Sequence, residues 1–230
     1  MWDIAASYRR ILDQIGEAAA KSGREPANIK LLGAAKSQTI ESLRAAMACG
    51  VSLFGENYVQ EAREKIRAIG GGAEWHMIGH LQRNKARLAA DLFDVIESLD
   101  GIALARELDA EGRKCGKIVR AFVEVNLGGE ESKSGIGPAR VPELLQCAAE
   151  LSNLRIDGLM TIPPFKDNLE AVRPYFKQLR DLRETLGRHC CSNIVLNELS
   201  MGMTHDFTVA IEEGATIVRI GTALFGPRKK

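Results

Sequence analysis

Short apolar runs recur along the chain and are separated by segments with the spacing of amphipathic helices. The runs are brief and rich in aliphatic residues, as is typical of strands that are buried on both faces. They lie at residues 29–35, 51–54, 74–78, 94–98, 117–125, 154–161, 194–199 and 216–220. We therefore expect eight strands that alternate with helices.

The segments between the runs place apolar residues three and four positions apart, which predicts helices that turn one face toward a core. This spacing is clearest in segments 39–48, 141–151 and 169–186, and Pro174 should start or kink the last of these helices. Residues 1–22 predict an additional helix ahead of the first strand. Its apolar face would carry Ile4, Tyr8, Ile11, Leu12 and Ile15.

Alternation of strands and helices implies parallel strands joined by right-handed crossovers. Eight such units favour an α/β fold of the closed (β/α)8 TIM barrel type, and an open doubly wound sheet is the structural alternative. No Gly/Ser linker divides the chain. We expect a single domain over residues 1–230, with the N-terminal helix at 1–22 and the barrel at 29–226.

The composition is that of an ordinary globular protein and excludes several classes of function. The chain has 230 residues, 45% hydrophobic and 27% charged, and its net charge of +1 argues against a nucleic acid or a membrane surface as partner. No apolar run approaches the roughly 20 residues of a transmembrane helix, and charges interrupt the N-terminus throughout. Its 5 scattered cysteines are typical of a reducing cytoplasm, which is the expected location.

Chemistry in a (β/α)8 barrel takes place at the C-terminal ends of the strands, so residues just past each apolar run are the candidates. Lys36 ends the first run, at a position where an unpaired charge is costly to bury. Other residues expected at this rim are Gly55, Glu56, Asn57, Gly79, His80, Asp100, Asn126, Pro163, Pro164, Ser200, Met201, Gly202, Gly221 and Thr222.

The loops after the seventh and eighth expected strands read SMGMTHDF (200–207) and IGTALFG (220–226), and they suit a phosphate group. Glycine lets a backbone N–H approach an anion closely, and Ser200 and Thr222 add hydroxyl donors. The alternative interpretation is that Ser200 or Thr204 caps a helix while the glycine only turns the chain.

Arg219 lies in the eighth expected strand on the same face as Gly221. It needs an acceptor, either on a ligand or in a structural ion pair with Glu198 or Glu124. A lysine in a partly apolar site is favoured as the neutral amine, which attacks aldehydes to form an imine. Lys36, a phosphate cradle and a nearby arginine together indicate a phosphorylated aldehyde, and pyridoxal 5′-phosphate (PLP) is a cofactor of this kind.

Five motifs along the chain closely resemble those of the pyridoxal phosphate homeostasis protein family. They read AAKSQ, FGENYVQE, WHMIGHLQRNK, GLMTIPP and LSMGMTHDFTVAIEEGATIVRIGTALFG, and the similarity extends from about residue 29 to 226. Members of this family bind PLP in a single barrel domain like the N-terminal domain of alanine racemase. The resemblance implies that Lys36 holds PLP as a Schiff base and that the cofactor is also contacted by Asn57, Ser200, Gly202, Arg219, Gly221 and Thr222.

The same resemblance assigns roles within that set. Asn57 lies close to the cofactor ring, the residues after strands seven and eight contact the phosphate, and Arg219 lies near the pyridine nitrogen. Because an arginine does not readily give up a proton, this nitrogen stays unprotonated and the ring is a weaker electron sink. The resemblance therefore implies a protein that holds and supplies or buffers PLP, with no catalytic residue assigned. One departure is Ala35, where the family has a Ser or Thr, and Ser37 stands where it has a Thr.

An amino-acid racemase is the alternative function, and it needs an acid or base on each face of the imine. Lys36 could be one, but the alanine racemases that the chain resembles take the other, a tyrosine, from a second domain. Of Tyr8, Tyr58 and Tyr175, only Tyr58 is expected near the rim. A phosphosugar barrel with an imine lysine is a remoter alternative. We expect a monomer that hands PLP to PLP-dependent apo-enzymes.

Two further features concern the rim. His76 and His80 are four residues apart on an expected strand, about 13 Å, which is too far to share one ion, so no metal is expected. The basic segment 82–87 is interpreted as a solvated face. The glycine-rich loop 128–136 could fold over the cofactor, and Lys133 is a hypothetical acceptor of PLP during transfer.

Overall fold

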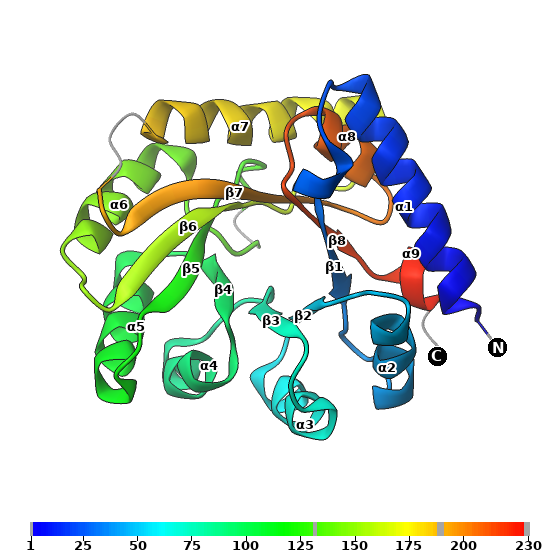
Figure 1. Ribbon diagram of the computed structural model, residues 1–230. Coiled ribbons are helices and arrows are strands. Elements are labelled where there is room, and N and C mark those ends of the chain that lie inside the picture. The colour runs from blue at the N-terminus through cyan, green and yellow to red at the C-terminus, as the bar shows by residue number, and fades with distance from the viewer. Residues whose placement is uncertain (1, 131–132, 188–190, 228–230) are drawn as a thin grey trace.

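The protein is described here from a computed structural model that covers residues 2–130, 133–187 and 191–227. Its strands form one closed barrel in which every neighbouring pair is parallel (Figure 1). In chain order the strands are β1 (Lys30–Ala34), β2 (Leu53–Glu56), β3 (Glu74–Met77), β4 (Val95–Leu99), β5 (Val119–Glu124), β6 (Leu154–Met160), β7 (Ile194–Met203) and β8 (Ile217–Ile220).

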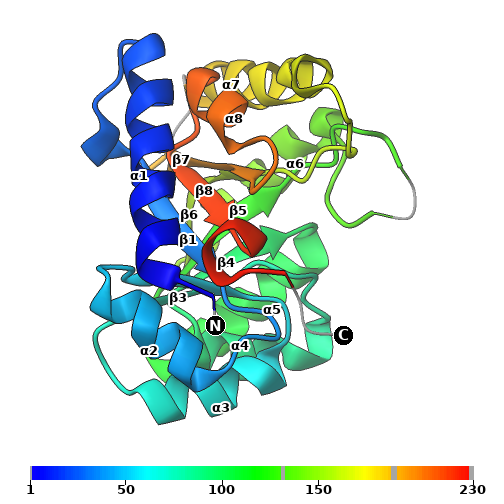
Figure 2. The ribbon, with the colours of Figure 1, turned by 90° about the vertical axis from the view of Figure 1, so that its right-hand side faces the viewer.

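Helices surround this barrel on its outside (Figures 1 and 2). The α-helices are α1 (Ile4–Lys21), α2 (Ile40–Ala48), α3 (Val59–Ile69), α4 (Ala86–Leu92), α5 (Ile102–Cys115), α6 (Val141–Ala149), α7 (Arg173–Gly187), α8 (Phe207–Glu212) and α9 (Thr222–Phe225). Short 3₁₀ turns are η1 (Pro26–Asn28), η2 (Arg83–Lys85), η3 (Pro138–Arg140) and η4 (Leu169–Ala171). The (β/α)8 barrel with an extra N-terminal helix is therefore confirmed.

Closure of the sheet distinguishes the barrel from the doubly wound alternative. The first strand pairs with the last, with Lys30 opposite Ile217 and Gly33 opposite Ile220. An open sheet would leave β1 and β8 with unpaired edges, whereas here both edges of each strand are bonded. The open doubly wound sheet is therefore excluded.

Alternation along the strands produces two cores. One face of each strand points outward to the helices and joins the large apolar layer between barrel and helices. The other face points into the barrel, where a smaller cluster is made of Leu32, Leu53, Ile78, Val95, Phe122, Met160 and Ile217. Because both faces are buried, the strands read as nearly continuous apolar runs in the sequence.

The extra helix α1 packs across α8 and α9 and beside α2 (Figure 2). Asp3 caps its N-terminus by accepting a hydrogen bond from the amide of Ala6 at 2.8 Å. Ile11 and Ile15 are buried, whereas Leu12, expected on the same apolar face, is 42% exposed. The helix therefore buries a narrower stripe than the sequence predicts.

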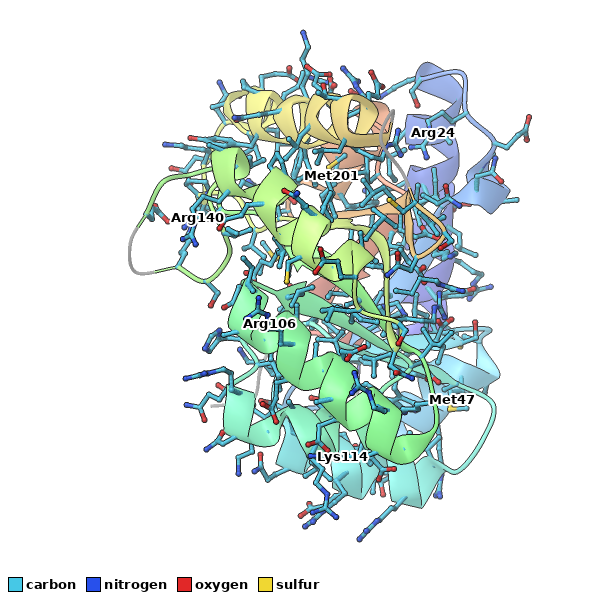
Figure 3. The ribbon with its side chains drawn as sticks, turned by 90° about the vertical axis from the view of Figure 1, so that its left-hand side faces the viewer. Arg24, Met47, Arg106, Lys114, Arg140 and Met201 are labelled. Atoms are coloured by element: carbon cyan, nitrogen blue, oxygen red, sulfur yellow. The ribbon has the colours of Figure 1, made fainter. Side chains whose placement is uncertain are left out.

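Arg106 and Lys114 lie on the exposed outer face of α5 (Figure 3), whereas Asp109 and Glu111 of the same helix are buried. Pro174 is the second residue of α7, so it starts that helix and introduces no kink. Strand boundaries agree with the sequence pattern to within two residues, except at β7. The structure describes no helix between residues 2 and 227, outside the two gaps, that is long and apolar enough to cross a membrane.

The end of β7 was predicted wrongly, because the expected strand stopped at residue 199 and the observed one continues to Met203. Its register with β8 shifts between Ser200 and Met203, and Gly202 has a φ of 89°. A β-bulge produces an irregularity of this kind. The segment stays in the sheet, but the strand bends there. Ser200 is consequently an interior residue of the barrel wall and does not lie in a loop beyond it.

Candidate functional site

The C-terminal ends of β1, β2 and β8 meet at one end of the barrel. Ala34 is paired with Gly55 of β2, and a Cβ atom placed on Gly221 would lie 3.6 Å from the Cβ of Ala34. Side chains alternate along a strand, so the next inward-facing position is Lys36 after Ala34 and Asn57 after Gly55. Three elements far apart in the sequence thus bring Lys36, Asn57 and Gly221 to the same end of the barrel.

Lys36 lies in the turn that follows β1 and is half-buried. Its side chain makes no hydrogen bond or ion pair with any residue that the structure describes. The backbone around it is tightly held, since the amide of Ala35 donates to the carbonyl of Gly55 and Ser37 adopts a left-handed φ of 61°. A half-buried amine without a partner is the group that imine formation requires.

Backbone amides converge at the start of α9, beside the end of β1. The amides of Gly221 and Ala223 both donate to the hydroxyl of Thr204, each at 3.3 Å. These are long bonds to a neutral oxygen, and an anion would be a stronger acceptor for the same donors. Thr222 is exposed between them. The loop after β8 thus brings two backbone donors together on the hydroxyl of Thr204, and its binding of a phosphate stays a prediction.

The two residues predicted to contact phosphate after strand seven have other partners here. The hydroxyl of Ser200 donates to Glu97 at 2.5 Å and accepts from Arg219 at 2.8 Å inside the barrel. Gly202 faces α8, where an added Cβ would lie only 2.5 Å from Ala210. Ser200 therefore has its hydroxyl committed to the interior, and the contacts of both residues with a phosphate stay predictions.

Arg219 is 4% exposed and extends into the barrel interior. Its Nη1 donates to the carbonyl and the hydroxyl of Ser200 at 2.7 and 2.8 Å, and its Nη2 donates to the carbonyl of Thr161 at 2.8 Å. The nearest carboxylate is Glu97, at 4.0 Å. Burial lowers the pKa of Arg219, while the charges of Glu97 and Glu124 oppose that shift.

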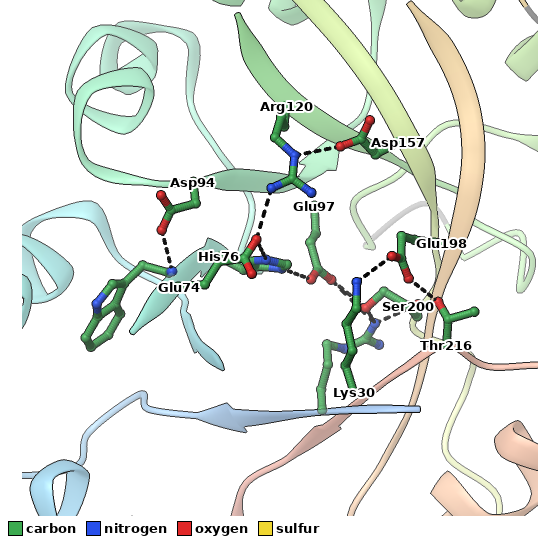
Figure 4. Close-up of polar contacts among 12 residues, drawn as sticks. Lys30, Glu74, His76, Asp94, Glu97, Arg120, Asp157, Glu198, Ser200 and Thr216 are labelled. Carbon is green, nitrogen blue, oxygen red and sulfur yellow. Dashed lines mark hydrogen bonds and ion pairs between the residues drawn. The ribbon is translucent and has the colours of Figure 1, made fainter. Parts of the chain in front are cut away.

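The sequence left open two ion pairs for Arg219, and the one with Glu198 is not formed. Glu198 points toward the other end of the barrel, where it binds Lys30 at 2.5 Å and the hydroxyl of Thr216 (Figure 4). The second, Glu124, acts on Arg219 through its charge, without an ion pair. Arg219 is thus held mainly by neutral oxygens, with Glu97 as its closest countercharge.

Glu97 connects Arg219 to a chain of polar side chains that runs through the barrel (Figure 4). Its carboxylate binds Ser200 on one side and Nδ1 of His76, at 2.5 Å, on the other. His76 continues to Glu74 at 3.3 Å, and Glu74 to Arg120 at 3.1 Å. Although burial lowers the pKa of His76, its hydrogen bonds to Glu74 and Glu97 raise that pKa to about 9, so the imidazole is charged at neutral pH.

His76 is thus packed inside the barrel, while His80 is 53% exposed in its side chain and pairs with Asp100 at 3.2 Å on the rim. The two histidines have separate partners. Across residues 2–227, apart from the gaps at 131–132 and 188–190, no group of three or more His, Cys, Asp or Glu side chains is arranged to hold a metal ion.

A small pocket of about 280 Å³ opens at the rim beside Asn57. Glu124 and Lys133 also line it. Glu124 is 6% exposed, and burial, together with the charges of Asp100 and Glu97, raises its pKa to about 7 against the opposing charge of Arg219. A carboxyl group of this kind exchanges its proton near neutral pH.

The glycine-rich loop lies along the same rim. Lys133 pairs with Glu130 at 2.5 Å, and the side chain of Asn126 donates to the carbonyl of Glu130 at 2.9 Å. Residues 131–132 of the predicted loop 128–136 lie outside the described residues. The lysine therefore lines the rim pocket, and its part in cofactor transfer stays a prediction.

The sequence did not predict that Glu97, His76 and Glu74 form a polar chain in the barrel interior. Glu97 stands in the run DVIES, which has the pattern of a buried strand, so its inward-pointing carboxylate left no separate signal. Thr204 was weighed only as a helix cap. The spacing of Glu97 and Val95 on one strand face could have shown that Glu97 points inward, once the barrel was assumed.

Comparison with known proteins gives one family. The family described as alanine racemase, N-terminal domain, matches residues 19–229. A protein of Aquifex aeolicus named pyridoxal phosphate homeostasis protein is 48% identical over 221 residues, which are 96% of this chain and 96% of that protein. The match thus extends over nearly the whole length of both.

Solved structures agree with this result. PipY of Synechococcus elongatus, solved with PLP bound, superposes with a TM-score of 0.82 at 35% identity, over 92% of this chain and 100% of PipY. An alanine racemase of Clostridium difficile superposes with a TM-score of 0.70 at 16% identity, over 96% of this chain but 57% of the racemase. The second likeness shows the shared barrel fold alone.

Proposed function

The chain belongs to the alanine racemase N-terminal domain family and, within it, to the pyridoxal phosphate homeostasis proteins, and from this premise we propose that it binds PLP reversibly and buffers or supplies it. The observation that carries the proposal is the amine of Lys36, which has no partner among the described residues and stands at the same end of the barrel as the converging amides of Gly221 and Ala223. Neither feature alone is specific, but together they match the two ends of a phosphorylated aldehyde.

The residues at the barrel end fit this cofactor. PLP supplies an aldehyde that condenses reversibly with a primary amine, and Lys36 is the amine available for a Schiff base. The amides at the start of α9 and the exposed hydroxyl of Thr222 would bind the phosphate in place of Thr204. Asn57 lies two residues beyond the paired Gly55 and would contact the ring. Ser200 and Gly202, at the end of β7, are the remaining proposed contacts of the phosphate.

Arg219 is the proposed neighbour of the pyridine nitrogen, and its surroundings favour holding over catalysis. Its guanidinium is fixed by three hydrogen bonds and remains a donor, so it cannot protonate the ring nitrogen. The ring would then withdraw electrons weakly, which disfavours carbanion chemistry. We therefore propose a protein that binds the cofactor without turnover as its main role.

A racemase is the second candidate, and the barrel supports it less well. Lys36 could serve one face of a substrate, but the other face needs a second acid or base. Tyr58 is at the rim but is 58% exposed, and Tyr8 and Tyr175 lie on the outer helices α1 and α7. An aldolase-like phosphosugar barrel would use the same lysine but not the same interior arginine.

The test is spectroscopic and chemical. Purified protein incubated with PLP should absorb in the visible range, and borohydride reduction followed by peptide mass analysis should locate the cofactor on Lys36. Lys36→Ala should abolish the colour and the label, because Lys36 is the proposed site of the Schiff base. Lys133→Ala is the matched control at the rim and should retain both. Wild-type protein that stays colourless and unlabelled contradicts the proposal.

Turnover distinguishes the two candidates. Loaded protein should be assayed with D- and L-amino acids by chiral chromatography, and we expect no exchange above that of free PLP. A rate comparable to ordinary PLP enzymes, on the order of 1 to 1000 per second, would establish the racemase instead. Handover is tested by adding an apo-form of a PLP enzyme and following its activation, with Lys133→Ala showing whether that lysine takes part.

A further inference from the structure

The segment that carries Lys36 is gripped from outside the barrel by one ionic cluster. Helix α3 contributes Glu61 and Lys65, one turn apart, and the end of β2 contributes Glu56. The ammonium of Lys65 lies 2.7 Å from a carboxylate oxygen of each glutamate. We call Glu56, Glu61 and Lys65 the α3 cluster.

This cluster binds the backbone on both sides of Lys36. The third hydrogen bond of the Lys65 ammonium goes to the carbonyl of Ala35, at 2.7 Å. The same oxygen of Glu61 that binds Lys65 accepts the amide of Ser37, also at 2.7 Å. The peptide groups that enter and leave Lys36 are thus both tied to the α3 cluster.

The backbone at Ser37 has a conformation that is unfavourable without supporting contacts. Ser37 has a φ of 61°, a left-handed conformation that residues other than glycine seldom adopt. The turn is closed further by the amide of Gln38, which donates to the same carbonyl of Ala35. Without Glu61 the amide of Ser37 would lose its acceptor, and the left-handed turn would lose the contact that fixes it.

Burial shows that the α3 cluster serves more than surface solubility. Glu56 is fully buried and Lys65 is 6% exposed. Buried ion pairs contribute little to stability compared with well-packed apolar groups, so stability alone does not account for these three charges. The hydrogen bonds of the α3 cluster lead to the backbone beside Lys36, and burial raises the pKa of the Glu56 carboxyl to about 7, against the pull of Lys65.

We propose that Lys65 and Glu61 are positioning residues for Lys36, which fix the turn at Ala35 and Ser37 so that the lysine side chain leaves it toward the start of α9. The inference rests on the proposed function, because it concerns how Lys36 meets the aldehyde of PLP. Among the described residues, the α3 cluster makes no hydrogen bond or ion pair with the side-chain amine of Lys36. Its effect is transmitted through two backbone hydrogen bonds.

The first experiment uses Lys65→Met in the full chain. The substitution keeps an unbranched side chain that is one atom shorter, and it removes all three hydrogen bonds. The rate of Schiff base formation with PLP should fall by about 10- to 100-fold, the usual cost of a reacting group displaced by an ångström. Binding of pyridoxine 5′-phosphate, which has no aldehyde, should change far less. Lys114→Met, which removes the exposed partner of the buried Glu111 on α5, is the matched control and should leave both unchanged.

The second experiment tests Glu61, whose side chain is 29% exposed and therefore tolerates substitution. Glu61→Gln keeps an oxygen acceptor for the Ser37 amide and should retain most of the imine rate, whereas Glu61→Ala should lose it. Hydrogen exchange at the Ser37 amide should accelerate in the alanine variant alone. This pair decides the question if Lys65→Met does not fold.

The outcomes separate this inference from the proposed function. Wild-type protein that fails to label at Lys36 refutes the function itself. Wild-type protein that labels at Lys36, while Lys65→Met and Glu61→Ala label at the same rate, overturns only the positioning role. Equal losses in imine formation and in pyridoxine 5′-phosphate binding would also overturn it, because the cluster would then support the whole site and not the lysine.

Discussion

Glu124 is a carboxyl group inside the barrel that the structure leaves without a hydrogen-bond partner among the described residues. Burial and its acidic neighbours raise its pKa to about 7, from 4.5. The folded protein therefore keeps this proton at pH values where the unfolded chain has lost it. Stability falls as pH rises from 4.5 to about 7, and the full cost applies above that.

Replacing Glu124 with Gln should remove this cost. At pH 8 the unloaded Glu124→Gln protein should be more stable than wild type by about 1 to 3 kcal/mol, and at pH 5 by less than about 1 kcal/mol. Urea unfolding at the two pH values measures the difference. Glu143→Gln, at an exposed position on α6, is the control and should show no such change. A gain for Glu124→Gln that is the same at both pH values contradicts the assigned cause.

Individual residues were the hardest level to predict from sequence. Lys36 and Gly221 stood out because strand ends and glycine turns leave local signals. Glu97 did not, because an inward carboxylate in an apolar strand is recognisable only when its partners His76, Ser200 and Arg219, from three other strands, are known to surround it. Contacts across a barrel join residues with no sequence relation, and no local pattern reports them.

At the level of elements, two glycines near the site have different jobs. Gly202 in β7 has a φ of 89°, and an added Cβ would lie 2.5 Å from Ala210 and 2.9 Å from the backbone of Phe207. Gly221 before α9 has a φ of −106°, and its added Cβ would meet only Ala34, at 3.6 Å. The first glycine is needed for packing of β7 on α8, and the second leaves space at the barrel mouth.

Alanine at each position should therefore have a different effect. Gly202→Ala should destabilise the fold by about 2 kcal/mol, from strain and crowding, and lower Tm by roughly 4 to 8 °C. Gly221→Ala should keep Tm close to wild type but weaken binding of pyridoxine 5′-phosphate by about tenfold, because its methyl group enters the phosphate loop. Calorimetry and a binding titration measure the two effects. A large fall in Tm for Gly221→Ala would show that this glycine is structural too.

Element positions were predictable because each strand is buried on both faces and each helix on one. The exception, β7, is instructive. Its apolar run ends at Leu199, but the strand continues to Met203. Ser200 faces the polar interior of the barrel, and Gly202 packs against α8. An apolar run predicts a strand only where the surroundings of the strand are apolar. A strand that ends in a polar barrel interior is therefore predicted to be shorter than it is.

At the level of the whole molecule, we propose a monomer. The exposed large apolar side chains of the described residues are spread over several surfaces, on α1, before β5 and around the rim. The rim set comprises Tyr58, Ile162, Phe165 and Met203. Stable dimers bury extended apolar patches, and none of the other surfaces offers a group of this kind.

Sedimentation velocity should show one species with the mass of a single chain, with and without PLP, over a wide range of protein concentrations. The rim set is the surface to watch. If a dimer forms, Phe165→Ser, which changes the most exposed of these side chains at 72%, should dissociate it. A dimer of the wild-type protein contradicts the proposal, and Phe165→Ser then shows whether the rim set forms its interface.

Closure of the barrel between β1 and β8 has a consequence for how the protein is made. Strand β1 gains its second neighbour only when β8 has been synthesised, because Lys30 pairs with Ile217. At about 5 to 20 residues per second, a ribosome takes tens of seconds to deliver that partner. Throughout this interval the growing chain can form at most an open sheet whose first strand has a free edge. Biosynthesis thus passes through a stage in which Lys36 is already present while the loop that would bind phosphate has not yet been translated.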